Sequence, residues 1–173
     1  FSECGGRQRP RLLAAGEERR MNTGIWIRVY RTEDASSLTA LFYDTVHRIN
    51  AKDYTREQIM AWAPDDLDPE EWDRSLSSHI SYIAMSEDKI VGFGDIDAAG
   101  YLDRLYVHAD YQRMGVGSAL CETLERAVSA AEIITHASVT AKPFFENRGY
   151  YTVKEQQVMR RGVWLTNYVM VKR

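Results

Sequence analysis

The sequence has little cysteine, little proline and no long apolar run. Its two cysteines, Cys4 and Cys121, have no Cys or His at metal-ligand spacing, so neither a disulfide framework nor a zinc site is expected. The apolar runs at 25–30 and 133–139 are far shorter than the roughly 18 residues that a membrane-spanning helix needs. Lys and Arg total 22 against 25 Asp and Glu, with both signs interspersed, which argues against a nucleic-acid-binding face. The composition therefore indicates an ordinary globular protein without membrane or nucleic-acid partners.

The first 20 residues differ in character from the rest of the chain. They are rich in glycine and arginine and show no apolar periodicity. We expect residues 1–20 to be a disordered leader or a tail derived from upstream sequence, because Met21 precedes a strand-like run and resembles a natural start. Residues 21–173 are then expected to form one domain. The lack of an apolar export signal favours a cytoplasmic location.

Hydrophobic periodicity predicts a mixed α/β order. Apolar residues at helical spacing and N-capping residues at Thr32, Thr55 and Thr140 predict helices, and alternating segments predict strands. The expected helices cover 32–49, 55–62, 70–78, 115–131 and 141–148. The expected strands cover 25–29, 81–85, 89–97, 101–108, 133–138, 150–158 and 163–171. The middle three strands are expected to form an antiparallel meander, and the last two a hairpin.

A glycine-containing loop joins the strand at 101–108 to the most strongly amphipathic helix. The loop and helix start read Gln112-Arg113-Met114-Gly115-Val116-Gly117-Ser118. Glycines let backbone N–H groups approach an anion closely, and the unpaired N–H groups at a helix start add roughly half a positive charge. The loop therefore suits a pyrophosphate, although many strand-to-helix loops need two glycines only to turn.

Two motifs in this region resemble those of the GNAT superfamily of N-acetyltransferases. Gln112-x-x-Gly115-x-Gly117 is similar to its pyrophosphate motif, Gln or Arg-x-x-Gly-x-Gly or Ala. The segment 137–150 looks like its Asn-x-x-Ala-x-x-Phe-Tyr-x-x-x-Gly-Phe segment. The resemblance covers about residues 25–173 and is closest to a bacterial small-molecule branch. It implies an α/β (α+β) GNAT fold, with a mixed, mostly antiparallel sheet of six to seven strands flanked by about four helices.

The resemblance also implies that acetyl-CoA is the cofactor and that no metal is involved. Main-chain groups of Leu105 and Val107 would pair with pantetheine, and the Val107 N–H would stabilise the carbonyl oxygen. Ser138 stands where the family often has Asn, and Phe145 stands where it often has a proton-donating Tyr. The expected cofactor-binding residues are Leu105, Tyr106, Val107, Gln112, Arg113, Met114, Gly115, Val116, Gly117, Ser118, Ser138, Phe144 and Phe145.

Aminolysis of a thioester needs a group that takes a proton from the amine and, usually, one that protonates the departing thiolate. We expect Asp103 to be the base, because strand alternation places it among apolar neighbours that raise a carboxylate pKa. The alternative is a solvent-facing or salt-bridged Asp103, and Asp95 is the second candidate base. Since Phe145 cannot donate a proton, Tyr150 is the candidate acid, with Tyr151, Tyr168 and Tyr101 as alternatives. The CoA thiolate could also leave without an acid, because a thiol with a pKa near 8.5 is a tolerable leaving group.

Acceptor selection in similar proteins falls to the first helices and the terminal hairpin. The residues expected to bind the acceptor are Phe42, Tyr43, His47, Tyr54, Trp62, Trp72, Tyr101 and Trp164. Aromatic residues at helical spacing also commonly form core, which is the alternative for Phe42 and Trp62.

The leading functional hypothesis is acetyl transfer from acetyl-CoA to a primary amine of a small molecule, by direct attack in a ternary complex. A protein lysine or N-terminal acetyltransferase is the alternative among enzymes. A catalytically idle acyl-CoA sensor is the alternative outside enzymes, and Phe145 is its best support. The terminal hairpin offers an edge through which a homodimer could form.

Overall fold

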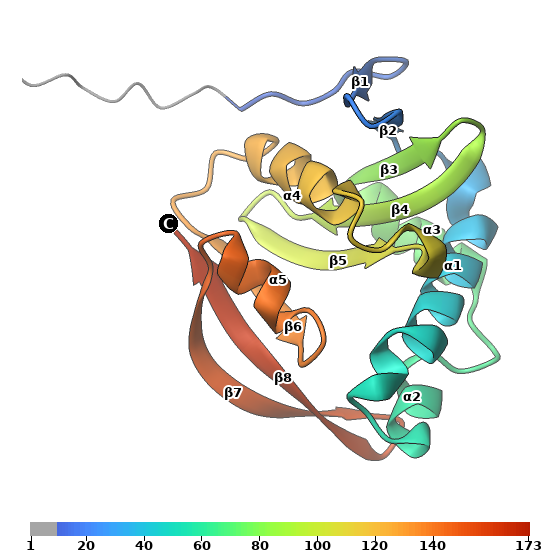
Figure 1. Ribbon diagram of the computed structural model, residues 1–173, viewed down its shortest axis with the longest axis vertical. Helices are drawn as coiled ribbons and strands as arrows, with labels where there is room; N and C mark the ends of the chain where they lie inside the picture. Colours follow the sequence, from blue (N-terminus) through green and yellow to red (C-terminus); the bar gives the residue numbers. More distant parts are fainter. Residues whose placement is uncertain (1–9) are drawn as a thin grey trace, which may run out of the picture.

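An eight-stranded sheet with helices on both faces forms the core of the fold (Figure 1). The computed structural model describes residues 10–173. The strands are β1 (Glu18–Arg20), β2 (Ile25–Val29), β3 (Ile80–Ser86), β4 (Lys89–Ile96), β5 (Tyr101–Val107), β6 (Ile133–Ser138), β7 (Tyr151–Arg160) and β8 (Val163–Lys172). The helices are α1 (Ala35–Arg48), α2 (Arg56–Trp62), α3 (Pro69–Ser78), α4 (Val116–Arg126) and α5 (Lys142–Asn147). Short 3-10 turns lie at Thr32–Asp34, Asn50–Lys52 and Ala109–Tyr111.

The strand order is β1-β2-β3-β4-β5-β6-β8-β7. All neighbouring strands run antiparallel except β5 and β6, which run parallel. The predicted mixed, mostly antiparallel sheet is therefore confirmed, with a slightly larger number of strands than expected. The additional strand is β1, which lies before the boundary expected at Met21.

The N-terminal segment rests on the sheet and on α4. Strand β1 pairs with β2, and the Arg19 guanidinium donates to Thr123 Oγ1 at 2.7 Å and to Glu122 Oε2 at 2.9 Å. The backbone N–H of Arg11 donates to the carbonyl of Arg126 at 2.8 Å. These contacts belong to the segment expected to be a leader, whose residues 1–9 fall outside the described part of the chain.

Local sequence signals explain the helix starts. Thr55 Oγ1 accepts from the Gln58 N–H, and the Gln58 side chain accepts from the Thr55 N–H, which completes a capping box. The predicted cap at Thr55 is thus confirmed. Helix α4 ends at Arg126 rather than at 131, because the N–H of Ala127 bonds to the Leu124 carbonyl in a tighter turn.

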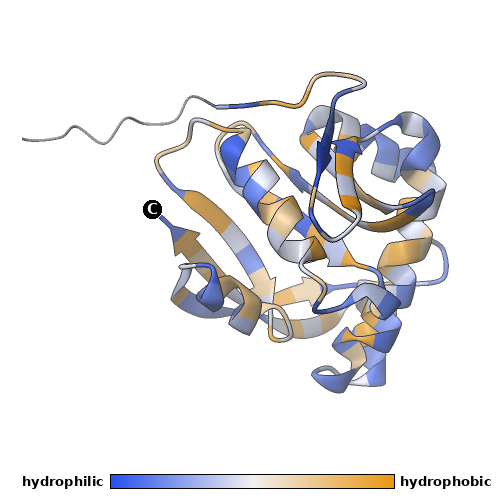
Figure 2. Cartoon of the chain, turned by 45° about the horizontal axis from the view of Figure 1, so that its top comes forward, coloured by the Kyte–Doolittle hydropathy of each residue, from blue (hydrophilic) through white to orange (hydrophobic). Residues whose placement is uncertain are grey.

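Apolar side chains pack on both faces of the sheet. In Figure 2 the colouring marks hydrophobic residues along the strands and on parts of the helices. Helix α4 contributes Leu120 and Leu124 to one cluster, both fully buried. Helices α1 and α3 contribute Leu38 and Leu76 to the other. Helices therefore pack against both faces of the sheet, and this packing fixes the positions of the strand ends.

Two irregularities occur in the pairing of strand β5 with its neighbours. Strands β5 and β6 pair only at Tyr101 with Ile134 and at Leu102 with Thr135, and beyond these residues they separate. The second irregularity is a bulge in β5, where Asp95 pairs with Arg104 and Ile96 with Leu102, so that Asp103 has no partner in β4. Bulges re-aim side chains and are common beside active sites.

Candidate active site

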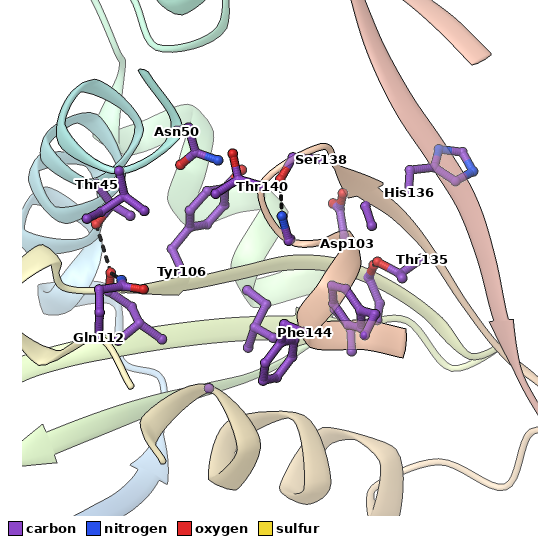
Figure 3. A pocket seen from close by; sticks show the side chains of 18 of the residues that line it. Thr45, Asn50, Asp103, Tyr106, Gln112, Thr135, His136, Ser138, Thr140 and Phe144 are labelled. Atoms are coloured by element: carbon purple, nitrogen blue, oxygen red, sulfur yellow. Dashed lines mark hydrogen bonds between the residues drawn. The ribbon is translucent and has the colours of Figure 1, made fainter. Parts of the chain in front are cut away.

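A first pocket lies where β5 and β6 separate (Figure 3). Leu105 and Val107 of β5 form one wall, and Ser138 at the end of β6 lies on the other. Helix α5 contributes Phe144 and Phe145. The pocket has a volume of about 200 Å³.

The open edge of β5 presents backbone groups to this pocket. The Val107 carbonyl accepts from Thr45 Oγ1 at 3.0 Å and from Gln112 Nε2 at 2.8 Å, whereas the next N–H, of His108, donates to Val91 of β4. Because the backbone groups of successive strand residues point to opposite edges, the N–H groups of Leu105 and Val107 point toward the gap between β5 and β6.

The loop before α4 presents a row of unpaired N–H groups. Within residues 10–173, no backbone N–H from Gln112 to Ser118 donates to a protein acceptor. Arg113 and Gly115 have φ angles of 60° and 81°, which turn successive N–H groups toward a common side. A Cβ at Gly117 would lie 3.3 Å from the Phe144 ring, so the loop and α5 approach closely there. This concave, positively polarised surface suits an anionic group.

A second pocket, of about 280 Å³, lies between the helices and the terminal hairpin. It is lined by Phe42, Tyr54, Trp62, Trp72, Tyr101, Asp103, Arg104, Tyr106, His136, Ser138, Val158, Arg160, Leu165, Thr166 and Asn167. Five of these residues also line the first pocket: Trp62, Asp103, Tyr106, His136 and Ser138. We call these five residues the junction, because the two pockets meet there.

The junction contains one acidic side chain, Asp103, whose pKa is raised above the usual aspartate value. Burial raises the pKa of Asp103, and the nearby Asp95 carboxylate raises it further. Burial also lowers the pKa of His136 and raises that of the Tyr106 phenol. Near neutral pH the junction therefore holds a neutral imidazole, a protonated phenol and a carboxyl group that binds protons more readily than a free aspartate.

A family model described as an acetyltransferase (GNAT) domain matches residues 50–172. The chain belongs to the GNAT acetyltransferase family. It is 39% identical over 146 residues to the uncharacterized N-acetyltransferase YafP of Escherichia coli K12, and the match covers 84% of this chain and 94% of that protein. The family assigns the chain to the acyltransferases, as the sequence motifs predicted.

Solved GNAT structures have the same fold. A GCN5-related N-acetyltransferase from Rhodopseudomonas palustris matches with a TM-score of 0.82 and 31% identity, over 96% of this chain and 99% of that one. The PaiA N-acetyltransferase of Thermoplasma acidophilum, solved in complex with coenzyme A, matches with a TM-score of 0.69 and 17% identity, over 86% and 98%. Among the described residues, no helix is both long and apolar enough to cross a membrane.

The expected cofactor-binding residues of this GNAT domain divide into two groups. The first pocket is lined by Leu105, Tyr106, Val107, Gln112, Gly117, Ser138, Phe144 and Phe145. Five residues do not line it, and one of them, Val116, is buried in the core: Arg113, Met114, Gly115, Val116 and Ser118. Their backbone N–H groups belong to the unpaired row of the loop. Ser138 Oγ accepts from the Ala141 N–H at 3.0 Å, so it caps the turn that was expected to be capped by Thr140.

Asp95 is enclosed and does not line either pocket. Its side chain is fully buried and accepts from Arg104 Nε and Nη2 at 2.9 Å each, and it lies 2.7 Å from His79 Nδ1. The Asp103 carboxylate lies within 4.8 Å of this group. The oxygens of Asp95, the second candidate base, are occupied by Arg104 and His79, so Asp95 does not reach an amine in either pocket directly, and its role as a base stays a prediction. Asp95 instead acts on the site through its charge beside Asp103.

Replacing Arg104 by Leu is expected to lower the free energy of unfolding by about 3–5 kcal/mol, because it leaves the fully buried Asp95 carboxylate without its cation. Urea unfolding measures this change. The matched control is Arg126→Leu, which removes an exposed pair with Glu122 and should cost less than about 1 kcal/mol. Equal losses in the two variants would contradict a structural role for the Arg104–Asp95 pair.

Tyr150 lies outside both pockets, so its predicted role as the acid is wrong. It is 3% exposed, and its hydroxyl donates to Glu125 Oε1 at 2.9 Å, beneath α4. The same carboxylate accepts from Lys172 Nζ at 3.0 Å and from Cys121. Burial raises the pKa of Cys121 to about 12, and burial also raises that of Tyr150. This cluster ties α4 to the C-terminal strands and cannot reach the first pocket.

Only some of the aromatic residues expected at the acceptor site line the second pocket. Phe42, Tyr54, Trp62, Trp72 and Tyr101 line the second pocket. Tyr43, His47 and Trp164 do not, and their prediction is corrected. Tyr43 stacks on His47 and donates to Asp65, His47 Nε2 lies 2.8 Å from the Ala63 carbonyl, and Trp164 is 56% exposed on the hairpin. Three pocket residues were missed: His136, Arg160 and Asn167. Arg160 and Asn167 reach the pocket only through the folded β7–β8 hairpin, and His136 reaches it from β6.

Proposed function

We propose that this GNAT protein transfers an acetyl group from acetyl-CoA to a primary amine of a small molecule, with both substrates bound together. The observation that carries the proposal is the junction, since one pocket opens toward the N–H-rich loop and the other toward aromatic side chains, and both include Asp103. A donor in the first pocket and an amine in the second would meet at this carboxylate. Such proximity favours direct transfer.

The residues present fit acetyl-CoA in the first pocket. The unpaired N–H groups of residues 112–118 would hold the pyrophosphate, and the open edge of β5 at Leu105 and Val107 would pair with pantetheine. Gly117 leaves room that a side chain would occupy. When bound, acetyl-CoA supplies the acetyl group as an activated thioester. The N–H of Val107 is the donor that would polarise its carbonyl.

Asp103 is the proposed proton acceptor for the amine. Its raised pKa brings the carboxyl group closer to the pKa range in which a base both accepts and releases protons near neutral pH. The bulge supports this role, because it takes Asp103 out of the ladder and leaves it at the junction, where its carboxylate lies 3.6 Å from Arg104 Nη2. His136 at the same junction is the second candidate, with a neutral ring favoured by its lowered pKa.

Tyr106 is the proposed proton donor in place of the tyrosine that Phe145 replaces. It is the tyrosine that lines both pockets, and its raised pKa keeps the phenol protonated. Phe42 and Phe93 pack against its ring at centroid distances of 4.9 and 5.7 Å and hold it in place. A phenol held in this way would protonate a departing thiolate without reorganisation.

The shape of the second pocket supports a small acceptor rather than a peptide. Its walls come from α1, α2 and α3 on one side and from the β7–β8 hairpin on the other, with Phe42, Trp72 and Val158 among them. A peptide acceptor needs a groove that continues past the reacting amine. A volume of about 280 Å³ suits one small molecule better.

The test is thiol release from acetyl-CoA by the purified chain against a panel of small primary amines and lysine-containing peptides, with acetylated product identified by mass. Turnover of small amines supports the proposal. Turnover of peptides alone would favour a protein acetyltransferase. Tight acetyl-CoA binding without any acylated product would favour a sensor and contradict the proposal.

A further inference from the structure

One cation in the second pocket has no acidic partner. Arg160, the last residue of β7, lines this pocket, and no carboxylate among residues 10–173 lies within ion-pair distance of it. The other pocket arginine, Arg104, pairs with Asp95 at 2.9 Å and with Asp103 at 3.6 Å. Its chain neighbour, Arg161, pairs with Asp66 at 2.9 Å and does not line the pocket. The Arg160 guanidinium is therefore available to a bound anion.

The opposite charge lies across the same pocket. Asp103 is at the junction, and although burial dominates its pKa shift, the positive charge of Arg160 acts on it in the opposing direction. The two groups are thus within electrostatic range but form no ion pair among the described residues; the cation that pairs with Asp103, at 3.6 Å, is Arg104. A ligand with one positive and one negative end could occupy the space between them.

An unpaired amide lies beside the junction. Asn167 lines the second pocket, and its Oδ1 atom is buried without a hydrogen-bond partner among the described residues. It faces Ser138 across the β6–β8 ladder, and Ser138 is itself a junction residue. A buried oxygen without a donor is costly unless a ligand supplies one. An ammonium group near Asp103 would supply such a donor.

We infer that the acceptor is an amino-carboxylate, a primary amine whose carboxylate binds to Arg160 while its ammonium group first binds at Asp103 and Asn167. This inference rests on the proposed function and names its substrate class. Arginine suits the role because its planar guanidinium binds a carboxylate through two parallel hydrogen bonds. Arg160 is then a specificity-determining residue and takes no part in proton transfer.

Matched amine pairs test this inference in the full chain. The pairs are L-phenylalanine with 2-phenylethylamine, and 4-(aminomethyl)benzoate with benzylamine. In each pair, only the first amine carries a carboxylate. The distance between the amine and the carboxylate is short in L-phenylalanine and longer in 4-(aminomethyl)benzoate. Aromatic bodies are chosen because Phe42, Trp62 and Trp72 line the pocket. The wild type is expected to favour the carboxylated member of at least one pair by about 10- to 100-fold in kcat/KM, the range for a charge-assisted pair.

Arg160→Gln is expected to remove that preference, whereas the control Arg161→Gln should keep it, because Arg161 contacts Asp66 outside the pocket. The ratio within each pair is the readout, so a general loss of activity does not imitate the effect. Three results would overturn the inference: no preference in either pair, a preference for the member without the carboxylate, or the same loss of preference in both variants.

A binding measurement separates this inference from the proposed function. Tryptophan fluorescence reports the second pocket through Trp62 and Trp72, so each amine can be titrated in the presence of coenzyme A without turnover. Tighter binding of 4-(aminomethyl)benzoate than of benzylamine, lost in Arg160→Gln, supports the inference even if no acetyl group is transferred. Acetyl transfer without any such difference would leave the function intact and the inference wrong.

Discussion

Replacing Gly117 by Glu is expected to weaken acetyl-CoA binding by about 1000-fold or more, the largest effect of any single change in the first pocket. The introduced carboxylate would repel the negatively charged pyrophosphate of acetyl-CoA. Such repulsion costs several kcal/mol, and each 1.4 kcal/mol lowers the affinity about tenfold. The new carboxylate would stand among the N–H groups of the loop, and its Cβ alone would lie 3.3 Å from Phe144 and 3.5 Å from Val107. Calorimetric titration with acetyl-CoA measures the loss.

Two controls separate charge from crowding. Gly117→Ala adds only the Cβ and is expected to weaken binding much less than the Glu variant. Ser129→Glu adds the same charge at an exposed position beyond α4 and should leave binding unchanged. Wild-type affinity in Gly117→Glu would show that the loop does not hold the pyrophosphate.

Replacing Asp103 by Asn is expected to lower kcat by about 100- to 10,000-fold near neutral pH, the usual contribution of a general base. The amide keeps the shape of the side chain but cannot take a proton. Acetyl-CoA affinity, measured by the same titration, should change little, because the proposed clamp is made of backbone groups. A loss confined to KM would instead assign Asp103 to binding.

The dependence of the acetylation rate on pH, compared between the wild type and Asp103→Asn, tests whether Asp103 is the base. Because burial raises the pKa of Asp103, its carboxylate forms only above the ordinary aspartate range, and the wild-type rate should rise with pH through that raised value. In Asp103→Asn this limb should disappear. The remaining rate should recover at high pH, where the amine loses its proton to water. An unchanged limb would move the base to His136 or to solvent.

Much of the fold could be predicted from local patterns. The capping box at Thr55 and Gln58 and the alternation in β6 are short-range signals, and the structure repeats them within one or two residues. Strand β1 was missed because Glu18–Arg20 carries no apolar alternation and is held by pairing with β2 and by contacts of Arg19 with α4. Such long-range pairing leaves no local signature.

The donor side of the site could be predicted better than the acid–base side. A glycine loop before a helix is a contiguous motif, and Gly117 and Gln112 of this loop line the first pocket. Strand alternation placed Asp103 beside Leu105 and Val107, but the bulge, which no residue pattern announced, places it at the junction.

The surroundings of Asp95 and Tyr150 could not be predicted from the sequence around each residue. Asp95 is saturated by Arg104 and His79, and Tyr150 is engaged by Glu125, so both are polar residues that serve packing. Their partners are distant in sequence or lie on other elements. The pocket role of Arg160 was missed for the same reason, since only the closed hairpin brings it opposite Asp103.

Initial rates measured over a matrix of acetyl-CoA and amine concentrations test the central claim most directly. If both substrates occupy their pockets together and meet at Asp103, the double-reciprocal lines should converge, and no acetylated protein should be found by mass after incubation with acetyl-CoA alone. Parallel lines, together with a stoichiometric acetylated protein, would show that the acetyl group passes through the enzyme. That result would contradict direct transfer at the junction.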